Sequence, residues 1–184
     1  MSWSEFCKNF GLDPRMHPAD LSKIITMPKE GIESALKWVK NPKASLFLHG
    51  EPGRGKTYFM HALMKKLIET YSCVEIRWHR MKELDDKILD AIKEKSSSSY
   101  LLKCLCEVDF LFLDDFGIER PTERCERDIY EIIDKRNGWF LPTVISSNLD
   151  REGIERFYGQ RILSRLKEFS WIRFNGTDLR GTGV

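Results

Sequence analysis

One eight-residue stretch constrains the fold of this chain more than any other: Gly50-Glu51-Pro52-Gly53-Arg54-Gly55-Lys56-Thr57. It has the form Gly-x-x-x-x-Gly-Lys-Thr, which between a strand and a helix wraps main-chain N–H groups around phosphate oxygens. The apolar run 45–49 before it predicts a short buried strand, and the apolar stripe in 58–70 predicts a helix. A chance glycine-rich turn is the alternative, but these flanks favour a nucleotide site, with Lys56 on the β- and γ-phosphates and the Thr57 hydroxyl on Mg²⁺.

The composition is typical of a single globular domain. The 184 residues carry a formal net charge of +2, and 41% are hydrophobic and 32% charged. No apolar run reaches the length of a membrane span, and the N-terminus lacks the order of a signal peptide. The five cysteines are scattered, so we expect a reducing, cytoplasmic setting and no membrane partner.

Predicted strands and helices alternate along the chain. Residues 1–27 are interpreted as an N-terminal arm or linker, and 28–184 as one domain. We expect Thr122 and Asp150 to be helix N-caps and Gly138 to end a helix in the C′ position. The order of elements predicts an α/β fold with three layers, in which helices flank a mostly parallel, roughly five-stranded sheet. The expected helices are 28–40, 58–70, 82–95, 101–108, 122–137 and 161–169. The expected strands are 45–49, 73–78, 109–113, 143–147 and 171–174. The polar run 96–99 is expected to be a loop or cap.

Polar side chains follow two further predicted strands. Asp114-Asp115 follows the apolar run 110–113, and Asn148 follows the strand 143–147. Ligands of parallel sheets bind beyond the carboxyl ends of the strands, so we expect these residues to lie beside the phosphate loop. There Asp114 would hold Mg²⁺, Asp115 would orient or deprotonate the attacking water, and Asn148 would orient that water or contact the γ-phosphate. The alternatives are a solvated acidic turn and a turn-forming asparagine.

Two arginines share one face of a predicted helix, because Arg161 and Arg165 lie one helical turn apart. An arginine that reaches the γ-phosphate of a neighbouring subunit stabilises the charge that develops during phosphoryl transfer. With such an arginine finger, two copies of the chain would together form one complete ATP site. Solvated surface arginines at the same spacing are the alternative.

In this order the motifs resemble the AAA+ ATPases of the bacterial helicase-loader group, which includes DnaC-, DnaI- and IstB-like proteins and has DnaA as a cousin. The resemblance covers residues 30–180 and concerns the AAA+ domain only. The acidic strand end followed by Ser-Ser-Asn and Arg-x-x-x-Arg is more specific than the phosphate loop. The matching stretches are 50–57, Leu113-Asp114-Asp115-Phe116-Gly117, Asp134-Lys135-Arg136, Pro142-Thr143-Val144-Ile145-Ser146-Ser147-Asn148-Leu149 and Gln160-Arg161-Ile162-Leu163-Ser164-Arg165-Leu166.

The resemblance implies ATP and Mg²⁺ as cofactors. Thr57 and Asp114 would take the metal role, Asp115 the catalytic acid position and Asn148 the sensor 1 position. Arg161 and Arg165 would form the arginine-finger region, with Arg165 preferred because of its Ser-Arg dipeptide, and the Asp178-Leu179-Arg180 ending would supply sensor 2. The implied nucleotide contacts are Gly50, Glu51, Pro52, Gly53, Arg54, Gly55, Lys56, Thr57, Tyr58 and Arg180.

Three departures from the family pattern matter. Asp115 stands where most AAA+ enzymes have Glu, and its shorter side chain would slow hydrolysis. The chain leaves almost no room for a separate helical lid after Arg180, which fits the loaders. The arm 1–27 is shorter than the helicase-binding domain of the loaders. The helix at 82–95 is similar to the insertion that contacts single-stranded DNA in the family.

The function implied by the resemblance is that of a replicative-helicase loader-type ATPase that assembles on single-stranded DNA. Its partners would be a replicative helicase, single-stranded DNA and further copies of itself through the ATP site. An IstB-like transposition helper, a non-hydrolysing ATP-gated adaptor and a small-molecule kinase remain as alternatives, although a kinase would need a substrate-binding lid. The near-neutral charge indicates that any contact with DNA is local.

Overall fold

The computed structural model describes Glu5, residues 19–21 and 24, and then 29–94, 98–176 and 178. Within these residues five strands form one parallel sheet in the order β2-β3-β4-β1-β5. This arrangement confirms the predicted fold class. The strands are β1 (Leu46–His49), β2 (Ile76–Arg80), β3 (Phe110–Phe116), β4 (Thr143–Ser147) and β5 (Ser170–Arg173).

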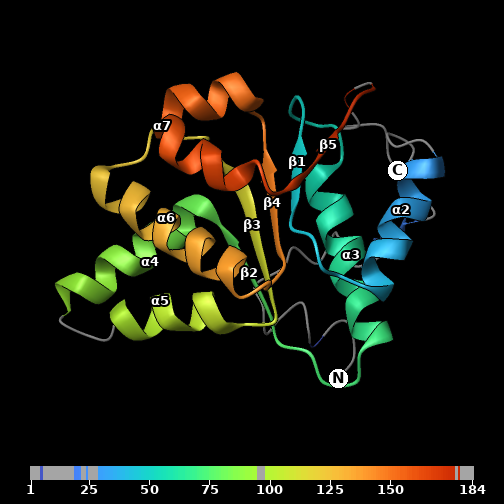
Figure 1. The fold of residues 1–184 in the computed structure, drawn as a ribbon, viewed down its shortest axis with the longest axis horizontal. Helices are drawn as coiled ribbons and strands as arrows, with labels where there is room; N and C mark the ends of the chain where they lie inside the picture. The colour runs from blue at the N-terminus through green and yellow to red at the C-terminus, as the bar shows by residue number, and fades with distance from the viewer. Residues whose placement is uncertain are drawn as a thin grey trace.

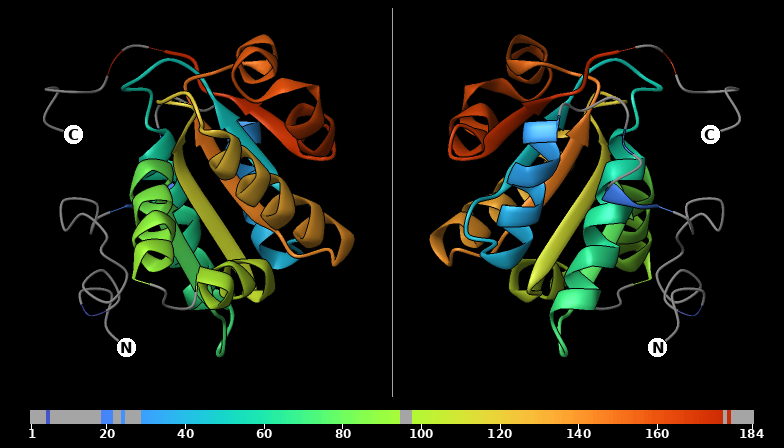
Figure 2. Two further views of the ribbon diagram at one scale, coloured as in Figure 1. Left: turned by 90° about the vertical axis from the view of Figure 1, so that its left-hand side faces the viewer. Right: turned by 90° about the vertical axis from the view of Figure 1, so that its right-hand side faces the viewer.

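Helices cover both faces of the sheet. On one face lie α2 (Lys29–Lys40) and α3 (Lys56–Thr70), and on the other lie α4 (Met81–Lys93), α5 (Ser98–Glu107), α6 (Glu123–Gly138) and α7 (Arg151–Leu166) (Figures 1 and 2). The side chains of β1 show how one strand serves both layers, because Leu46 and Leu48 pack with α3 whereas Phe47 packs with α6 and α7. A strand that is buried on both faces must be apolar throughout, which explains the continuous hydrophobic runs.

Several boundaries differ from those expected. β2 begins at Ile76, later than predicted. α5 includes Ser98 and Ser99, which were expected in a loop or helix cap. Gly138 is the last residue of α6, and the positive φ lies at Phe140, with φ 55°, so the predicted C′ glycine is wrong.

Most of the predicted arm 1–27 lies outside the described residues. Of its described residues, Ala19, Leu21 and Ile24 are buried in the core cluster that includes α2 and α3. The N-caps at Thr122 and Asp150 are present, accepting hydrogen bonds from Cys125 N and Gly153 N.

Arg136 of α6 is fully buried beside the starts of β3 and β4, at the opposite end of the strands from the phosphate loop, which follows the end of β1. Its guanidinium donates to the carbonyl oxygens of Val108 (2.7 Å) and Pro142 (2.8 Å) and to the Thr143 hydroxyl (2.9 Å). Burial lowers its pKa to about 10, so the group stays protonated at neutral pH. Arg136 thus joins α6 to the starts of β3 and β4 through main-chain acceptors.

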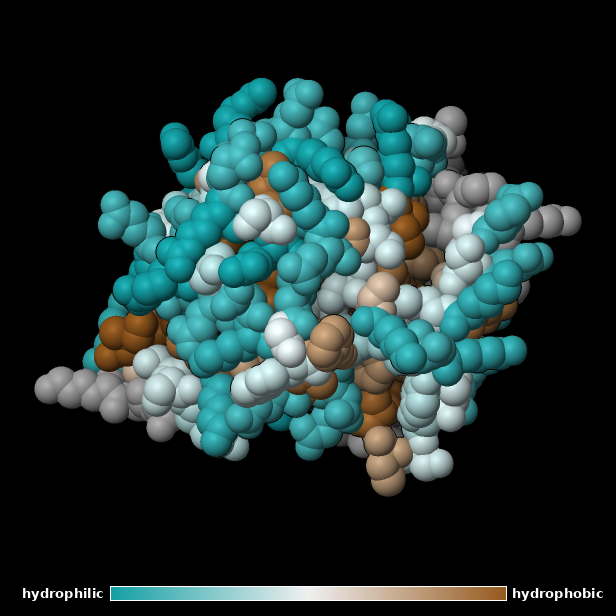
Figure 3. All heavy atoms as spheres, in the orientation of Figure 1, coloured by the Kyte–Doolittle hydropathy of each residue, from teal (hydrophilic) through white to brown (hydrophobic). Residues whose placement is uncertain are grey.

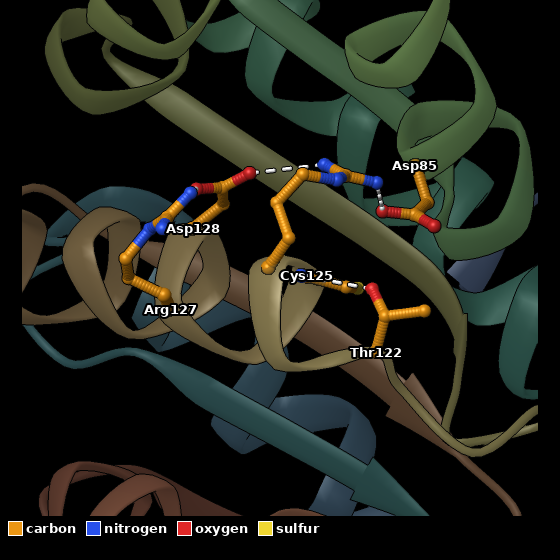
Figure 4. A network of polar contacts seen from close by, with 6 residues as sticks. Asp85, Thr122, Cys125, Arg127 and Asp128 are labelled. Atoms are coloured by element: carbon orange, nitrogen blue, oxygen red, sulfur yellow. Dashed lines mark hydrogen bonds and ion pairs between the residues drawn. The ribbon is translucent and has the colours of Figure 1, made fainter.

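A second polar network fastens α4 to α6 (Figure 4). Arg124 of α6 pairs with Asp85 of α4 at 2.5 Å and with Asp128 of its own helix at 3.0 Å. These side chains are largely shielded from solvent, so the pairs are screened less than surface pairs. The helix that follows β2 is therefore held to the body of the domain.

The surface facing the viewer in Figure 3 is mainly hydrophilic, with small separate hydrophobic groups. Among the described residues, no helix combines the length and the apolar character that crossing a membrane requires.

Candidate ATP-hydrolysis site

The phosphate loop connects the end of β1 to the start of α3. Gly55 is the N-cap of α3, so the first free N–H groups of the helix point into the loop. Gly53 has φ 77°, and a Cβ atom there would collide with the carboxylate of Asp178. The loop therefore requires glycine at Gly53 for its backbone conformation, since the flexible Asp178 side chain could turn away. At Gly50, in contrast, a Cβ atom would lie 2.3 Å from the main-chain carbonyl oxygen of Phe174, directly after β5.

The Lys56 ammonium links the start of the phosphate loop to Asn148, the residue that follows β4. It donates to the carbonyl oxygens of Gly50 at 2.6 Å and Glu51 at 2.9 Å, and to Oδ1 of Asn148 at 2.8 Å. The residue is only 7% exposed. A phosphate in the loop would meet a cation already held at the centre of the site, next to the predicted sensor residue.

Asp114 lies at the bottom of the site and is completely buried. Its Oδ1 accepts hydrogen bonds from the hydroxyls of Thr57 (3.2 Å) and Ser146. Burial raises the pKa of the Asp114 carboxyl, and the charge of Asp115 acts in the same direction, while the Ser146 hydrogen bond opposes them. Three elements, α3, β3 and β4, thus converge on this one carboxylate.

The residues present fit a magnesium ion. Asp114 Oδ2 is buried and has no hydrogen-bond partner among the described residues, and such an atom is costly unless a cation or donor meets it. The Thr57 hydroxyl lies beside it on the same carboxylate. Mg²⁺ is usually bound through one or two carboxylates and keeps water and phosphate oxygens as its other ligands.

The two acids form a bulge in β3 instead of following its end. Leu113 pairs with Ile145 and Phe116 with Ser147, so Asp114 and Asp115 together face the single residue Ser146. Asp115 has φ 60°, a conformation that non-glycine residues adopt rarely. Because a bulge changes the direction of its side chains, adjacent acids take different environments: Asp114 is buried and Asp115 half-buried.

A cleft of about 650 Å³ opens beside the loop. It lies between the ends of β4, β1 and β5 and the start of α7, and its lining includes Asn148. Burial, followed by the charge of Arg173, lowers the pKa of His49 in this lining. Other lining residues are Glu51, Arg54, Asp150, Glu152, Arg156 and Phe174.

The two candidate finger arginines lie together against α6. The Arg161 guanidinium stacks on the ring of Tyr130 at 3.7 Å from its centroid. Arg165 Nε lies 2.7 Å from Asp134 Oδ1, and its Nη2 donates to the Tyr130 hydroxyl at 3.0 Å. These donors lower the pKa of Tyr130. Arg165 is thus tied within its own subunit, whereas Arg161 is exposed.

The structure brings together Lys56, Thr57, Asp114 and Asn148 from separate parts of the sequence, as expected. The side chain of Tyr58 points away from them, because its hydroxyl accepts from the Asp20 N–H at 3.1 Å and its ring packs with the core cluster of α2 and α3. Arg180 lies outside the described residues. Sequence reasoning missed Ser146, although a buried serine in an apolar strand was a usable signal.

A family model, the bacterial DnaA ATPase domain, matches residues 30–169. The chain belongs to this family. The match covers the phosphate loop, the acidic bulge, Asn148 and both finger candidates, so the resemblance to AAA+ ATPases of the initiator and helicase-loader type is confirmed for the AAA+ domain.

Individual relatives of this DnaA-type domain agree with the family assignment. This chain is 26% identical over 140 residues to the replicative helicase loader DnaC of Escherichia coli strain K12, and the match covers 74% of this chain and 56% of DnaC. The chain thus spans about half the length of that relative. A crystal structure of the DnaC helicase loader has a TM-score of 0.76 at 22% identity, over 89% of this chain and 100% of that one. The structure of the DnaA initiator bound to AMPPCP and single-stranded DNA has a TM-score of 0.77 at 16% identity, over 91% of this chain and 52% of that one. Both show a shared fold.

Proposed function

We propose that this DnaA-type AAA+ domain binds ATP with Mg²⁺ and hydrolyses it, and that it acts in DNA replication as a factor of the helicase-loader type. The observation that carries the proposal is the convergence of Lys56, Thr57, Asp114 and Asn148 around one phosphate loop. This convergence provides a cation for phosphate, a metal site and a polar side chain at the phosphate end. Homology to DnaC and the DnaA ATPase domain supports the role in replication.

Each residue has a defined task in the proposed reaction. The Lys56 ammonium and the loop N–H groups bind the phosphates. Thr57 and Asp114 would hold Mg²⁺, which when bound neutralises charge on the β- and γ-phosphates. Asp115 accepts a proton from the attacking water or orients it, and Asn148 aligns that water or the γ-phosphate. The shorter reach of Asp115 relative to glutamate implies slow basal turnover.

The proposed working state is an assembly of several copies in the cytoplasm, bound to single-stranded DNA and to a replicative helicase. Arg161 and Arg165 are exposed or half-exposed on one face of α7, where they can reach a neighbouring copy. In α4, the helix proposed to contact DNA, Met81, Leu84 and Ile88 are buried, and Lys82 and Lys87 are exposed. Relatives named as helicase loader and single-stranded-DNA-bound initiator support these partners.

The test compares ATP turnover by the protein alone, with single-stranded DNA and with duplex DNA, alongside Lys56→Ala as the inactive control. A rate that rises on single-stranded DNA and depends on Lys56 supports the proposal, and co-purification with a replicative helicase supports the loader role. Preferential stimulation by duplex DNA would favour an IstB-like helper. ATP binding without turnover under every condition would favour an adaptor and overturn the enzymatic part.

A further inference from the structure

We propose that Ser146 is a positioning residue that fixes both acids of the site through one hydroxyl group. The inference rests on the proposed function, because it concerns how the same site holds Asp114 and Asp115. Ser146 lies in β4, two residues before Asn148, and touches neither the nucleotide loop nor Lys56 in the contacts described above.

The Ser146 hydroxyl makes two hydrogen bonds of opposite sense. It donates to Asp114 Oδ1 and accepts from the Asp115 N–H at 3.1 Å. A serine hydroxyl has one proton and two lone pairs, so it can serve a carboxylate and an N–H at once. Ser146 is 1% exposed, so water cannot easily replace these contacts if the hydroxyl is removed.

The position of Ser146 in the sheet explains why both contacts fall on it. It is the single β4 residue opposite the two-residue bulge of β3, where Asp115 has φ 60°. Ladder pairing is interrupted there, so the Asp115 N–H has lost its regular sheet partner and finds the Ser146 oxygen instead. The next residue, Ser147, donates to the Phe116 carbonyl at 2.6 Å and holds the far side of the bulge.

The donation to Oδ1 also determines which oxygen of Asp114 faces the metal position. Because Ser146 and Thr57 both donate to Oδ1, the other oxygen, Oδ2, is left without a partner among the described residues. Ser146 therefore directs Oδ2 toward the cation while holding Asp115 in its unusual backbone conformation. Its role is to act through these two acids and not on the substrate.

The test uses Ser146→Ala, with Ser146→Thr to restore a hydroxyl and Ser45→Ala as a matched control. Ser45 precedes β1, and its hydroxyl accepts from the N–H of Thr143 at the start of β4 at 3.0 Å, so its removal also costs a hydrogen bond from a main-chain N–H to a serine hydroxyl, but at the opposite end of β4. We expect Ser146→Ala to lower kcat by about tenfold or more, with little change in KM. The gain in ATP affinity on adding Mg²⁺ should shrink as well. Ser146→Thr should regain activity, and Ser45→Ala should behave as the parent.

A second measurement requires no nucleotide. Amide hydrogen exchange of Asp115, followed by NMR in the nucleotide-free protein, should be faster in Ser146→Ala and unchanged in Ser45→Ala. If Ser146→Ala matches Ser45→Ala in kcat, in the Mg²⁺ effect and in Asp115 exchange, the proposal is overturned. If the parent neither binds nor hydrolyses ATP, the proposed function fails on its own, and Asp115 exchange still decides whether Ser146 holds the bulge.

Discussion

Lys56 Nζ and Asn148 Oδ1 lie 2.8 Å apart although 92 positions separate the two residues in the sequence. The contact joins the first turn of α3 to the residue after β4, and the next residue of that turn, Thr57, donates to Asp114 in the bulge of β3. A phosphate that draws Lys56 toward itself would therefore also change the contacts of Asn148. This link makes the lysine the first residue to test.

Lys56→Ala should lower ATP affinity by on the order of 100-fold, because the main countercharge for the phosphates is lost and a charge-assisted hydrogen bond contributes about 1.5–3 kcal/mol. Equilibrium binding of a fluorescent ATP analogue measures the change. Lys66→Ala is the control, since Lys66 lies on the same helix and pairs with Glu69. Equal affinity in the two variants would refute the assignment of the phosphate loop.

Asp115→Asn should keep ATP binding and lose hydrolysis, because the amide cannot accept the proton of the attacking water. Asp114→Asn should instead weaken the binding that depends on Mg²⁺, since it removes a negative charge at the metal position. Titrations with and without Mg²⁺, together with phosphate release, separate the two effects. Parental turnover in Asp115→Asn would show that another residue is the base.

Arg165→Ala, or Arg161→Ala if Arg161 is the finger, should leave ATP binding by a single copy intact and abolish the rise of specific activity with protein concentration. A finger arginine contributes on the order of 10³-fold or more in related phosphoryl-transfer enzymes. Because Arg165 is paired with Asp134 in its own subunit, a role in trans requires that pair to open, so Asp134→Asn should raise the activity if Arg165 is the finger.

Mixing subunits that carry different substitutions distinguishes the two arginines. Subunits with Lys56→Ala and subunits with an arginine variant each lack a different half of a shared site, so mixed interfaces should regain activity only for the true finger. The absence of recovery for both, with parental rates in both single variants, would make them ordinary surface residues.

The free energy of unfolding should fall as the pH is lowered from 6.5 to about 4. Burial lowers the pKa of His79 from 6.5 to about 4, and the charges of Lys87 and Arg77 act in the same direction. The unfolded chain binds more protons than the folded chain in this window, so acid favours unfolding. Urea unfolding at several pH values measures the slope, and His79→Gln should flatten it. Equal slopes in the parent and the variant would contradict the assignment.

Arg136→Leu should destabilise the domain by more than about 3 kcal/mol, because it leaves several buried carbonyl oxygens without donors. Arg136→Lys should also destabilise it, since an ammonium cannot reach acceptors spread over such a width. Denaturant unfolding gives both values. The neighbouring Lys135→Leu is the control, because Lys135 pairs with Glu131 at the surface, and a loss as large there would invalidate the reasoning.

The sequence was sufficient to predict the order of strands and helices along the chain because the central strands are marked by continuous apolar runs and the phosphate loop by a local motif. It was not sufficient for features that depend on pairing between distant segments. Asp114 and Asp115 were predicted after the end of a strand, whereas β3 continues through them. Only the register with β4 produces the bulge, and no local pattern encodes that register.

Charged residues show a second limit of local patterns. Arg136 near the end of a polar helix is typical of a solvated position, yet it is fully buried, because the starts of β3 and β4 leave carbonyl oxygens that need a donor. Arg165 is the preferred finger candidate, and its contacts with Asp134 and Tyr130 of α6 could not be read from its own helix. In both cases the partners lie farther away in the sequence than one helical turn, so helical periodicity does not reveal them.

The backbone break in α7 has a consequence for communication between copies. Gly159 has φ 73° and ψ 174° inside this helix, and no atom lies within 4 Å of a Cβ placed there, so the position demands glycine for its dihedral angles and not for space. The first part of the helix begins at Arg151, close to Asn148 at the end of β4, and the second part carries Arg161 and Arg165. Within the proposed assembly, the angle at Gly159 would therefore set how the residues beside a subunit's own nucleotide site are oriented relative to the arginines that face its neighbour.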